Sequence, residues 1–265
     1  MAEIWNKIAE NCDYIFNQLS DERTRDSGPG AGTLATVLFS YLYFCLKAGP
    51  AWMKDRKPYD LTRVIFYYNV FQILVSTYLS YEGFSVFISD YNFTCQPVIY
   101  ENTPGTRKIH SLVWYYAVLK LVELLDTVFF VLRKKTRQIS TLHIYHHSLM
   151  PIASFMAFKY YPNGHSVLLG VINTFVHMIM YTYYLLAGLG PKYQKIIWWK
   201  RHVTILQLVQ FLIIFVHNML PLFNGCSYPK WINLTLSVFS LHFVYMFGNF
   251  YYVNYIKASG NRKEN

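Results

Sequence analysis

Long apolar segments alternate along the chain with short polar connections. Segments of about 17–25 mostly apolar residues are long enough to cross a bilayer as helices. Strands of a membrane β-barrel would instead alternate polar and apolar positions, and these segments do not. The pattern therefore predicts an all-α polytopic membrane protein with seven transmembrane helices. The predicted segments are 32–49, 62–82, 109–132, 141–161, 165–189, 202–222 and 231–256.

Composition agrees with this class. The chain is 54% hydrophobic and only 14% charged, whereas soluble domains carry about 25% charged residues. No internal repeat divides it, so we expect one transmembrane domain over residues 32–256, with tails at 1–31 and 257–265. The polar, acidic N-terminal tail lacks the features of a cleavable signal. It forms either a short interfacial helix, for which Ile4, Ile8, Ile15 and Leu19 have the spacing, or a frayed end.

The distribution of basic residues predicts the orientation. Lys and Arg gather between the first and second, third and fourth, and fifth and sixth segments, and after the seventh. Because positive residues concentrate in cytoplasmic loops, we expect a lumenal or extracellular N-terminus and a cytosolic C-terminus. The formal net charge of +10 then reflects topology, and no nucleic acid is needed to explain it.

Two features of the predicted lumenal loops fit this orientation. Asn92-Phe93-Thr94 is a glycosylation sequon between the second and third segments. Cys95 and Cys226 lie in two loops on that side, where an oxidising compartment favours disulfides. They form either a bridge with each other or two free thiols.

Ionisable residues inside the predicted bilayer mark the candidate site, because such groups are costly in hydrocarbon. The run HIYHH places His143, His146 and His147 at i, i+3 and i+4, on one face of a helix. A rise of 1.5 Å per residue puts them in the cytosolic half of the membrane, at depths that overlap those of polar residues on three other helices. These residues are Lys120, Glu123 and Asp126 in segment three, Asn173, His177 and Tyr181 in segment five, and Gln207 in segment six.

Each polar group also has a purely structural interpretation. Lys120 and Glu123 can be a neutralised ion pair, and buried amides can bond one helix to another. For the histidines the alternative is a metal site, since HxxHH occurs in membrane di-iron desaturases and hydroxylases. With His177 added, one ion held by four histidines is possible, but a di-iron centre needs several histidine clusters, and the remaining histidines stand alone. We therefore expect no metal and favour imidazole as a nucleophile.

A seven-helix receptor is the other class considered. Receptors bind ligands in the outer half of the membrane, whereas this polar cluster is predicted in the cytosolic half. The pattern favours an enzyme.

Four motifs, in this order, resemble the signature of the ELO-type very-long-chain fatty acid elongases. They are KLVELLDTVFFVLRKK (120–135), HIYHH (143–147), NTFVHMIMYTYY (173–184) and TILQLVQ (204–210). The resemblance implies that helices two to seven form a barrel around an acyl tunnel open to the cytosol. It also implies that an acyl-CoA and malonyl-CoA condense to a 3-ketoacyl-CoA two carbons longer, with no further cofactor.

The resemblance implies the endoplasmic reticulum membrane, and the basic pair Arg262-Lys263 near the C-terminus is similar to a retrieval signal for it. The expected partners are the lipid bilayer and the ketoreductase, dehydratase and enoyl reductase of the elongation cycle.

By analogy with the family, His146 carries the acyl group and His177 is its close partner. His143 and His147 orient it or transfer protons, and Asn173, Gln207 and Asp126 fix tautomers or stabilise the enolate. Lys120, Glu123 and Tyr181 are expected to contact substrate. Basic residues at the cytosolic mouth either hold CoA phosphates or only set the topology. These are Lys134, Lys135, Lys192, Lys195 and Arg201.

Overall fold

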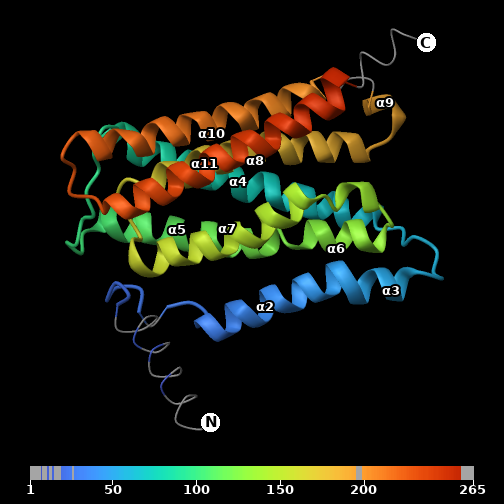
Figure 1. Cartoon of the computed structure of the whole chain (residues 1–265), viewed down its shortest axis with the longest axis horizontal. Helices are drawn as coiled ribbons and strands as arrows, with labels where there is room; N and C mark the ends of the chain where they lie inside the picture. The colour runs from blue at the N-terminus through green and yellow to red at the C-terminus, as the bar shows by residue number, and fades with distance from the viewer. Residues whose placement is uncertain are drawn as a thin grey trace. The chain divides into compact units, whose positions relative to one another are not determined.

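A computed structural model of the chain describes residues 19–25, 27–194 and 199–257, together with Lys7, Asn11 and Tyr14. Throughout these ranges the regular structure is helical and contains no strand (Figure 1). The helices form two compact units, each built from two stretches of chain. Unit 1 is Met1–Asp60 with Thr106–Asn163, and unit 2 is Leu61–Gly105 with Gly164–Asn265.

Unit 1 begins with a long helix in three parts: α2 (Ala31–Tyr43), a π-helical turn (Phe44–Ala48) and α3 (Gly49–Met53). Pro50 explains the π turn, because it has no N–H for the carbonyl four residues back and its ring crowds that carbonyl. The Gly49 N–H bonds the Phe44 carbonyl instead. A Cβ on Gly49 would lie 2.7 Å from both the Phe44 oxygen and Val131 Cγ1, so glycine permits close packing on Val131.

The predicted segment 109–132 is not one continuous helix. It forms α5 (Pro104–Val122) and α6 (Leu125–Leu132), with a break at Glu123 and Leu124. At the break, the Leu124 N–H bonds the Leu121 carbonyl and the Asp126 N–H bonds the Glu123 carbonyl, each three residues back. Hydrophobic periodicity did not predict this local tightening, because the apolar pattern runs across it.

Helix α7 (Thr141–Tyr160) completes unit 1, after a short 3-10 turn at Thr136–Gln138. The Ser140 side chain caps it by accepting a hydrogen bond from the His143 N–H at 3.2 Å. The unit packs around a hydrophobic cluster supplied by α2, α3, α6 and the connections beside them. Its buried members are Leu38, Tyr41, Cys45, Met53, Leu124 and Val131.

Residues 21–25 are bound to the last turn of α7. The Lys159 ammonium donates to the carbonyl oxygens of Thr24, at 2.9 Å, and Arg25, at 2.8 Å. The Lys159 carbonyl accepts from the Asp21 N–H, at 2.8 Å, and from the Thr24 hydroxyl, at 3.0 Å. Burial alone would raise the pKa of Asp21. The hydrogen bonds from Arg23 and the positive charge of Arg23 have the larger combined effect, so the pKa of Asp21 is lowered.

Sequence reasoning missed this attachment and treated the whole N-terminal tail as interfacial or frayed. Ile4, Ile8 and Ile15, on which the interfacial helix was predicted, lie outside the described residues.

Unit 2 consists of α4 (Thr62–Asp90), α8 (Val167–Gly188), the short α9 (Pro191–Gln194), α10 (Lys200–Phe223) and α11 (Lys230–Tyr251). A π-helical turn, Tyr252–Lys257, follows α11. Helix α4 packs along α8, and α10 packs along α11 and also contacts α8. Phe87, Leu168 and Val171 form a buried cluster between α4 and α8. Helix α4 continues to residue 90, beyond the predicted end at 82.

One end of unit 2 is fixed by a disulfide and a buried polar network. Cys95 and Cys226 are bonded, with their Cα atoms 5.5 Å apart. The Tyr91 hydroxyl donates to the His165 carbonyl at 2.8 Å and lies 3.0 Å from His217 Nε2. His165 Nε2 lies 2.9 Å from the His217 carbonyl. These two isolated histidines therefore have structural partners.

By length and hydropathy, four stretches of the described helices qualify as membrane spans: Ala31–Met53, Val167–Gly188, Lys200–Phe223 and Lys230–Lys257. Many of their large apolar side chains are exposed, Phe39 and Tyr245 among them, which fits contact with lipid. The chain is thus an all-helical protein of membrane type. The three other predicted segments also form helices, and the total of seven spans stays a prediction.

Replacing Lys159 with methionine should destabilise unit 1. The substitution keeps the apolar stem but removes the ammonium donor from the Arg25 carbonyl and leaves the Thr24 carbonyl with the Ser27 N–H alone. This should lower the free energy of unfolding by about 2 kcal/mol. Thermal unfolding in detergent would measure it, with Lys57→Met as control, because Lys57 is exposed. Equal stability of the two variants would show that the attachment contributes nothing.

Candidate active site

The histidines of HIYHH lie together in the first two turns of α7. The His143 and His147 ring centroids are 4.1 Å apart, and those of His146 and His147 are 5.3 Å apart. His146 and His147 are buried. Pro151, four residues after His147, has no N–H to give to the His147 carbonyl. The sequence thus places three imidazoles together, those of His146 and His147 buried and that of His143 half-buried, next to a local gap in the helical hydrogen bonding.

The neighbouring helix α6 contributes hydroxyl and carboxyl groups to this region of unit 1. Thr127 Oγ1 lies 2.8 Å from His143 Nε2, and Thr127 is fully buried. The Phe130 ring centroid lies 5.2 Å from that of His143. Asp126, adjacent to Thr127, is also buried. The spacing of these residues predicted a shared face, and Thr127 gives a direct contact between two of the four motifs.

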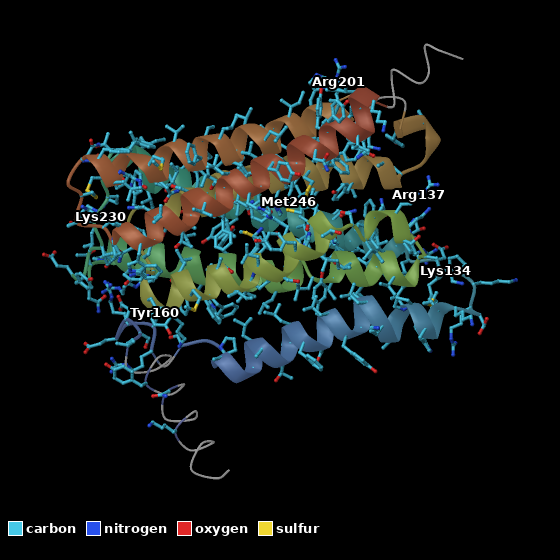
Figure 2. All side chains as sticks on the ribbon, viewed as in Figure 1. Lys134, Arg137, Tyr160, Arg201, Lys230 and Met246 are labelled. Atoms are coloured by element: carbon cyan, nitrogen blue, oxygen red, sulfur yellow. A yellow bond between two sulfur atoms is a disulfide. The ribbon has the colours of Figure 1, made fainter. Side chains whose placement is uncertain are left out.

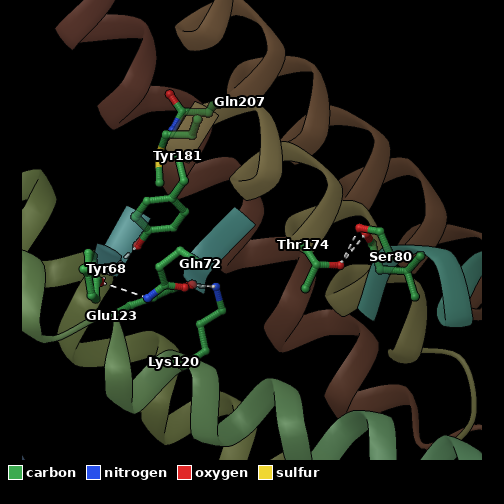
Figure 3. Close-up of polar contacts among 10 residues, drawn as sticks. Tyr68, Gln72, Ser80, Lys120, Glu123, Thr174, Tyr181 and Gln207 are labelled. Atoms are coloured by element: carbon green, nitrogen blue, oxygen red, sulfur yellow. Dashed lines mark hydrogen bonds and ion pairs between the residues drawn. The ribbon is translucent and has the colours of Figure 1, made fainter. Parts of the chain in front are cut away.

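Lys120 and Glu123 form a completely buried ion pair at the break between α5 and α6. Lys120 Nζ lies 2.7 Å and 2.9 Å from the two Glu123 carboxylate oxygens (Figure 3), and their side chains are 0% and 1% exposed. The ammonium also lies 4.9 Å from the Tyr116 ring centroid. Burying both charges is costly, and mutual pairing is what makes it tolerable. The sequence analysis considered a neutralised ion pair as the structural interpretation of these two residues, and the structure shows that pair. Contact of Lys120 and Glu123 with substrate stays a prediction.

Unit 2 carries the second group of predicted site residues, on one stripe of α8. Asn173, His177 and Tyr181 are 2%, 4% and 0% exposed, and the His177 and Tyr181 ring centroids are 5.9 Å apart. Gln207 on α10 donates to Met180 Sδ at 3.7 Å and so contacts α8 beside this stripe.

Helix α4 adds two residues to this group that sequence reasoning missed. The Tyr68 and Tyr181 hydroxyl oxygens are 3.5 Å apart, and Gln72 Nε2 donates to the Tyr68 hydroxyl at 2.9 Å (Figure 3). Gln72 is fully buried. The sequence signal for these two residues was a phenol and an amide four positions apart, on one face of the otherwise apolar segment 62–82.

The predicted catalytic residues are thus divided between the two units. His143, His146, His147 and Asp126 belong to unit 1, whereas Asn173, His177 and Gln207 belong to unit 2. Over the described ranges, no group of three or more His, Cys, Asp or Glu side chains is arranged to hold one metal ion. The expectation of a metal-free reaction stays a prediction.

The basic residues expected at the mouth are exposed where they are described. Lys134 lies at one end of unit 1, far from Tyr160 at the other end of α7 (Figure 2). Lys134 adopts a left-handed backbone conformation, with φ of 54°, and its ammonium donates to the Lys54 carbonyl at 3.1 Å. The others with described side chains are Lys135, Lys192 and Arg201, and Lys195 lies outside the described residues.

Comparison with known proteins assigns the chain to a family. Residues 31–263 match the model of the GNS1/SUR4 family, named ELO. A very long chain fatty acid elongase of Aedes aegypti is 42% identical over 97% of this chain and 73% of its own length. Very long chain fatty acid elongase 7 of Drosophila melanogaster is 38% identical, over 94% of this chain and 77% of its own. Very long chain fatty acid elongase 4 of Mus musculus is 38% identical, over 95% of this chain and 81% of its own. The chain therefore belongs to the ELO (GNS1/SUR4) family.

Proposed function

We propose that this protein is a fatty acid elongase that catalyses the condensing step. It joins a long-chain acyl-CoA to malonyl-CoA and releases a 3-ketoacyl-CoA two carbons longer, CO2 and CoA. Support comes from the family and from its elongase relatives, which match nearly the whole chain. The observation that carries the mechanism is the group of adjacent imidazoles on α7, two of them buried, with the buried Thr127 hydroxyl of α6 in contact with one of them.

Histidine is the best candidate for the group that holds the acyl chain. Condensation needs a nucleophile that keeps the acyl group while CoA leaves and malonyl-CoA enters. Cys95 and Cys226 are in a disulfide, and Cys45 is enclosed in the hydrophobic cluster of unit 1. An imidazole, by contrast, is a competent nucleophile in its neutral form.

In the first half-reaction, an unprotonated ring nitrogen of His146 attacks the thioester carbonyl carbon. The C–N bond forms, the C–S bond breaks, and the CoA thiolate takes the proton released from the imidazole. In the second, malonyl-CoA loses CO2, and the resulting enolate carbon attacks the acyl-imidazole carbonyl. The C–N bond breaks, the 3-ketoacyl-CoA forms, and the departing imidazolate takes up one proton, ultimately from solvent, which restores the neutral imidazole.

Other polar groups of the two units have the chemistry that these steps need. His177, His143 and His147 accept and return protons or orient the reacting ring. Asn173, Gln207 and Asp126 are placed on the same helices as the histidines or next to them, and we assign them to tautomer control and to stabilising the enolate. A buried, largely apolar surrounding excludes water, which would hydrolyse an acyl-imidazole.

We further propose that the exposed basic residues bind the CoA phosphates from the cytosol. Lys134, Lys135, Lys192 and Arg201 have accessible charged groups, which suit phosphate recognition. We also propose that the protein lies in the endoplasmic reticulum membrane as a multi-pass protein with a lumenal N-terminus and a cytosolic C-terminus. There it would hand its product to the ketoreductase, dehydratase and enoyl reductase of the cycle. Arg262 and Lys263, the proposed retrieval signal, lie outside the described residues.

Purified protein incubated with an acyl-CoA alone should form a covalent acyl adduct. Intact-protein mass spectrometry should show the added acyl mass on wild type and on His242→Ala, a control at an exposed histidine of α11. His146→Ala should show no adduct, and its condensation rate should fall by roughly 10³-fold or more. His177→Ala should also lose condensation, with an unchanged thermal transition.

Condensation is measured with radiolabelled malonyl-CoA and a panel of acyl-CoAs, followed by separation of the 3-keto products. Full activity in His146→Ala would refute the assignment of the acyl carrier. Absence of any 3-keto product from the wild type with every acyl-CoA would refute the proposed function itself.

Activity should be independent of metal. Chelation should leave the condensation rate within about twofold, because the proposed nucleophile is an imidazole that needs no Lewis acid. Elemental analysis of purified protein should find no stoichiometric iron or zinc. One or two equivalents of iron that are needed for turnover would support the desaturase or hydroxylase alternative instead.

The proposed orientation predicts a glycan on Asn92. Asn92 is exposed, and its Oδ1 accepts hydrogen bonds from the Thr94 N–H at 3.0 Å and the Thr94 hydroxyl at 2.8 Å. Glycosidase treatment should increase gel mobility in wild type but not in Asn92→Gln. Asn233 also begins a sequon, but it is fully buried in α11, so it serves as the negative control. An unmodified Asn92 accessible from the cytosolic side of sealed microsomes would overturn the orientation.

A further inference from the structure

A chain of hydroxyl groups leads from the first helix to the histidine group of unit 1. The Tyr41 hydroxyl, on α2, lies 2.8 Å from Thr127 Oγ1 on α6. The same Thr127 oxygen lies 2.8 Å from His143 Nε2 on α7. Tyr41 is 6% exposed and Thr127 is 0% exposed, so water does not compete for these contacts. Three helices thus meet in a hydrogen-bonded row whose far end is a catalytic-site imidazole.

The direction of the row follows from counting protons. Each hydroxyl has one proton to donate, and a neutral imidazole has one N–H and one acceptor nitrogen. If Tyr41 donates to Thr127 and Thr127 donates to His143 Nε2, both hydroxyl protons are used. If Thr127 instead accepts from both Tyr41 and His143 Nε2 through its two lone pairs, its own buried proton has no acceptor among the described residues. In the reverse direction, His143 Nε2 donates to Thr127 and Thr127 donates to Tyr41. The buried Tyr41 proton then lacks an acceptor among the described residues, since Thr127 is the one hydrogen-bond partner recorded for that hydroxyl.

A buried donor without an acceptor costs more than one made bond gains, so the first direction is preferred. It makes Nε2 of His143 the acceptor nitrogen and puts its proton on Nδ1. We infer that Tyr41 is a positioning residue that, through Thr127, fixes His143 as the neutral Nδ1–H tautomer. The first transmembrane helix is then a working part of the site.

This inference rests on the proposed function and refines it. Because Nε2 of His143 is already occupied by the Thr127 hydroxyl, His143 is not available to attack a thioester through that nitrogen. Its remaining ring nitrogen carries a proton, so it can donate a hydrogen bond but cannot act as a nucleophile. His143 is thus assigned to orientation and donation beside His147, whose ring centroid is 4.1 Å away. The role of acyl carrier is left to His146.

The position of Tyr41 is also fixed by local structure. Tyr41 belongs to the buried cluster that α2 forms with Leu124 and Val131 of the α5–α6 region. The π turn that follows, and the close approach of Gly49 to Val131, hold the same face of this helix against α6. By contrast Tyr43, two residues along, is 57% exposed. Tyr43 is therefore a suitable control for Tyr41, because it carries the same hydroxyl on the same helix but lies outside the hydrogen-bonded row.

The test uses Tyr41→Phe and Tyr43→Phe, each of which removes one hydroxyl from α2. Full-length protein labelled with ¹⁵N in its histidine rings reports the tautomer of each imidazole by NMR, and His143→Gln identifies the His143 signals. Wild type and Tyr43→Phe should show His143 protonated at Nδ1. Tyr41→Phe should show a mixture of the two tautomers. Its kcat for condensation should fall roughly tenfold, the factor expected for one buried hydrogen bond, with KM unchanged.

Thr127 supplies a second, independent pair. Thr127→Ser keeps the hydroxyl and should keep the Nδ1–H tautomer, whereas Thr127→Val removes the hydroxyl and should lose it, even if Tyr41→Phe fails to fold. Identical His143 signals in Tyr41→Phe and Tyr43→Phe, or in Thr127→Ser and Thr127→Val, would overturn the inference. The ring signals do not depend on turnover, so this outcome is separate from the adduct and product assays that test the proposed function.

Discussion

The cost of placing a polar group among apolar side chains governs most of this structure. In hydrocarbon, a charge or a hydrogen-bonding group is costly unless it has a partner. Lys120 is therefore found against Glu123, and the Tyr91 hydroxyl between His165 and His217. The same demand makes Gln72 bond to Tyr68 and Thr127 bond to both Tyr41 and His143. These pairings set the orientations of the side chains to which we assign the chemistry.

The existence of the helices could be predicted from the sequence, because apolar runs of spanning length have few other solutions. The grouping of His143, His146 and His147 was equally predictable, since spacing along one helix determines a shared face. Exact helix limits were less predictable. Helix α4 passes its expected end, and segment three breaks at Glu123, because both features depend on local hydrogen bonds that leave the apolar pattern unchanged.

The contributions of Tyr41, Tyr68 and Gln72 could not be predicted in the same way. Each lies on a helix where many aromatic or polar residues occur, and only the packing partner decides which of them turns inward. Tyr41 and Tyr43 differ by two positions, yet one is buried beside Thr127 and the other is exposed. Hydrophobic periodicity identifies the buried face of a helix only when the opposite face is polar. In a membrane helix both faces are apolar, so periodicity does not distinguish them. The residues that contact the histidines from other helices therefore need the tertiary structure.

The disulfide has a consequence for how the chain is connected. Cys95 and Cys226 are separated by 131 positions, and each belongs to a different one of the two stretches that build unit 2. The covalent ring that they close contains residues 106–163, the second stretch of unit 1, together with α8 and the whole of α10. All the histidines assigned to the reaction are thus inside the ring. A single cut in any loop between the two cysteines leaves the polypeptide as one covalent molecule, and the fragments separate only after reduction.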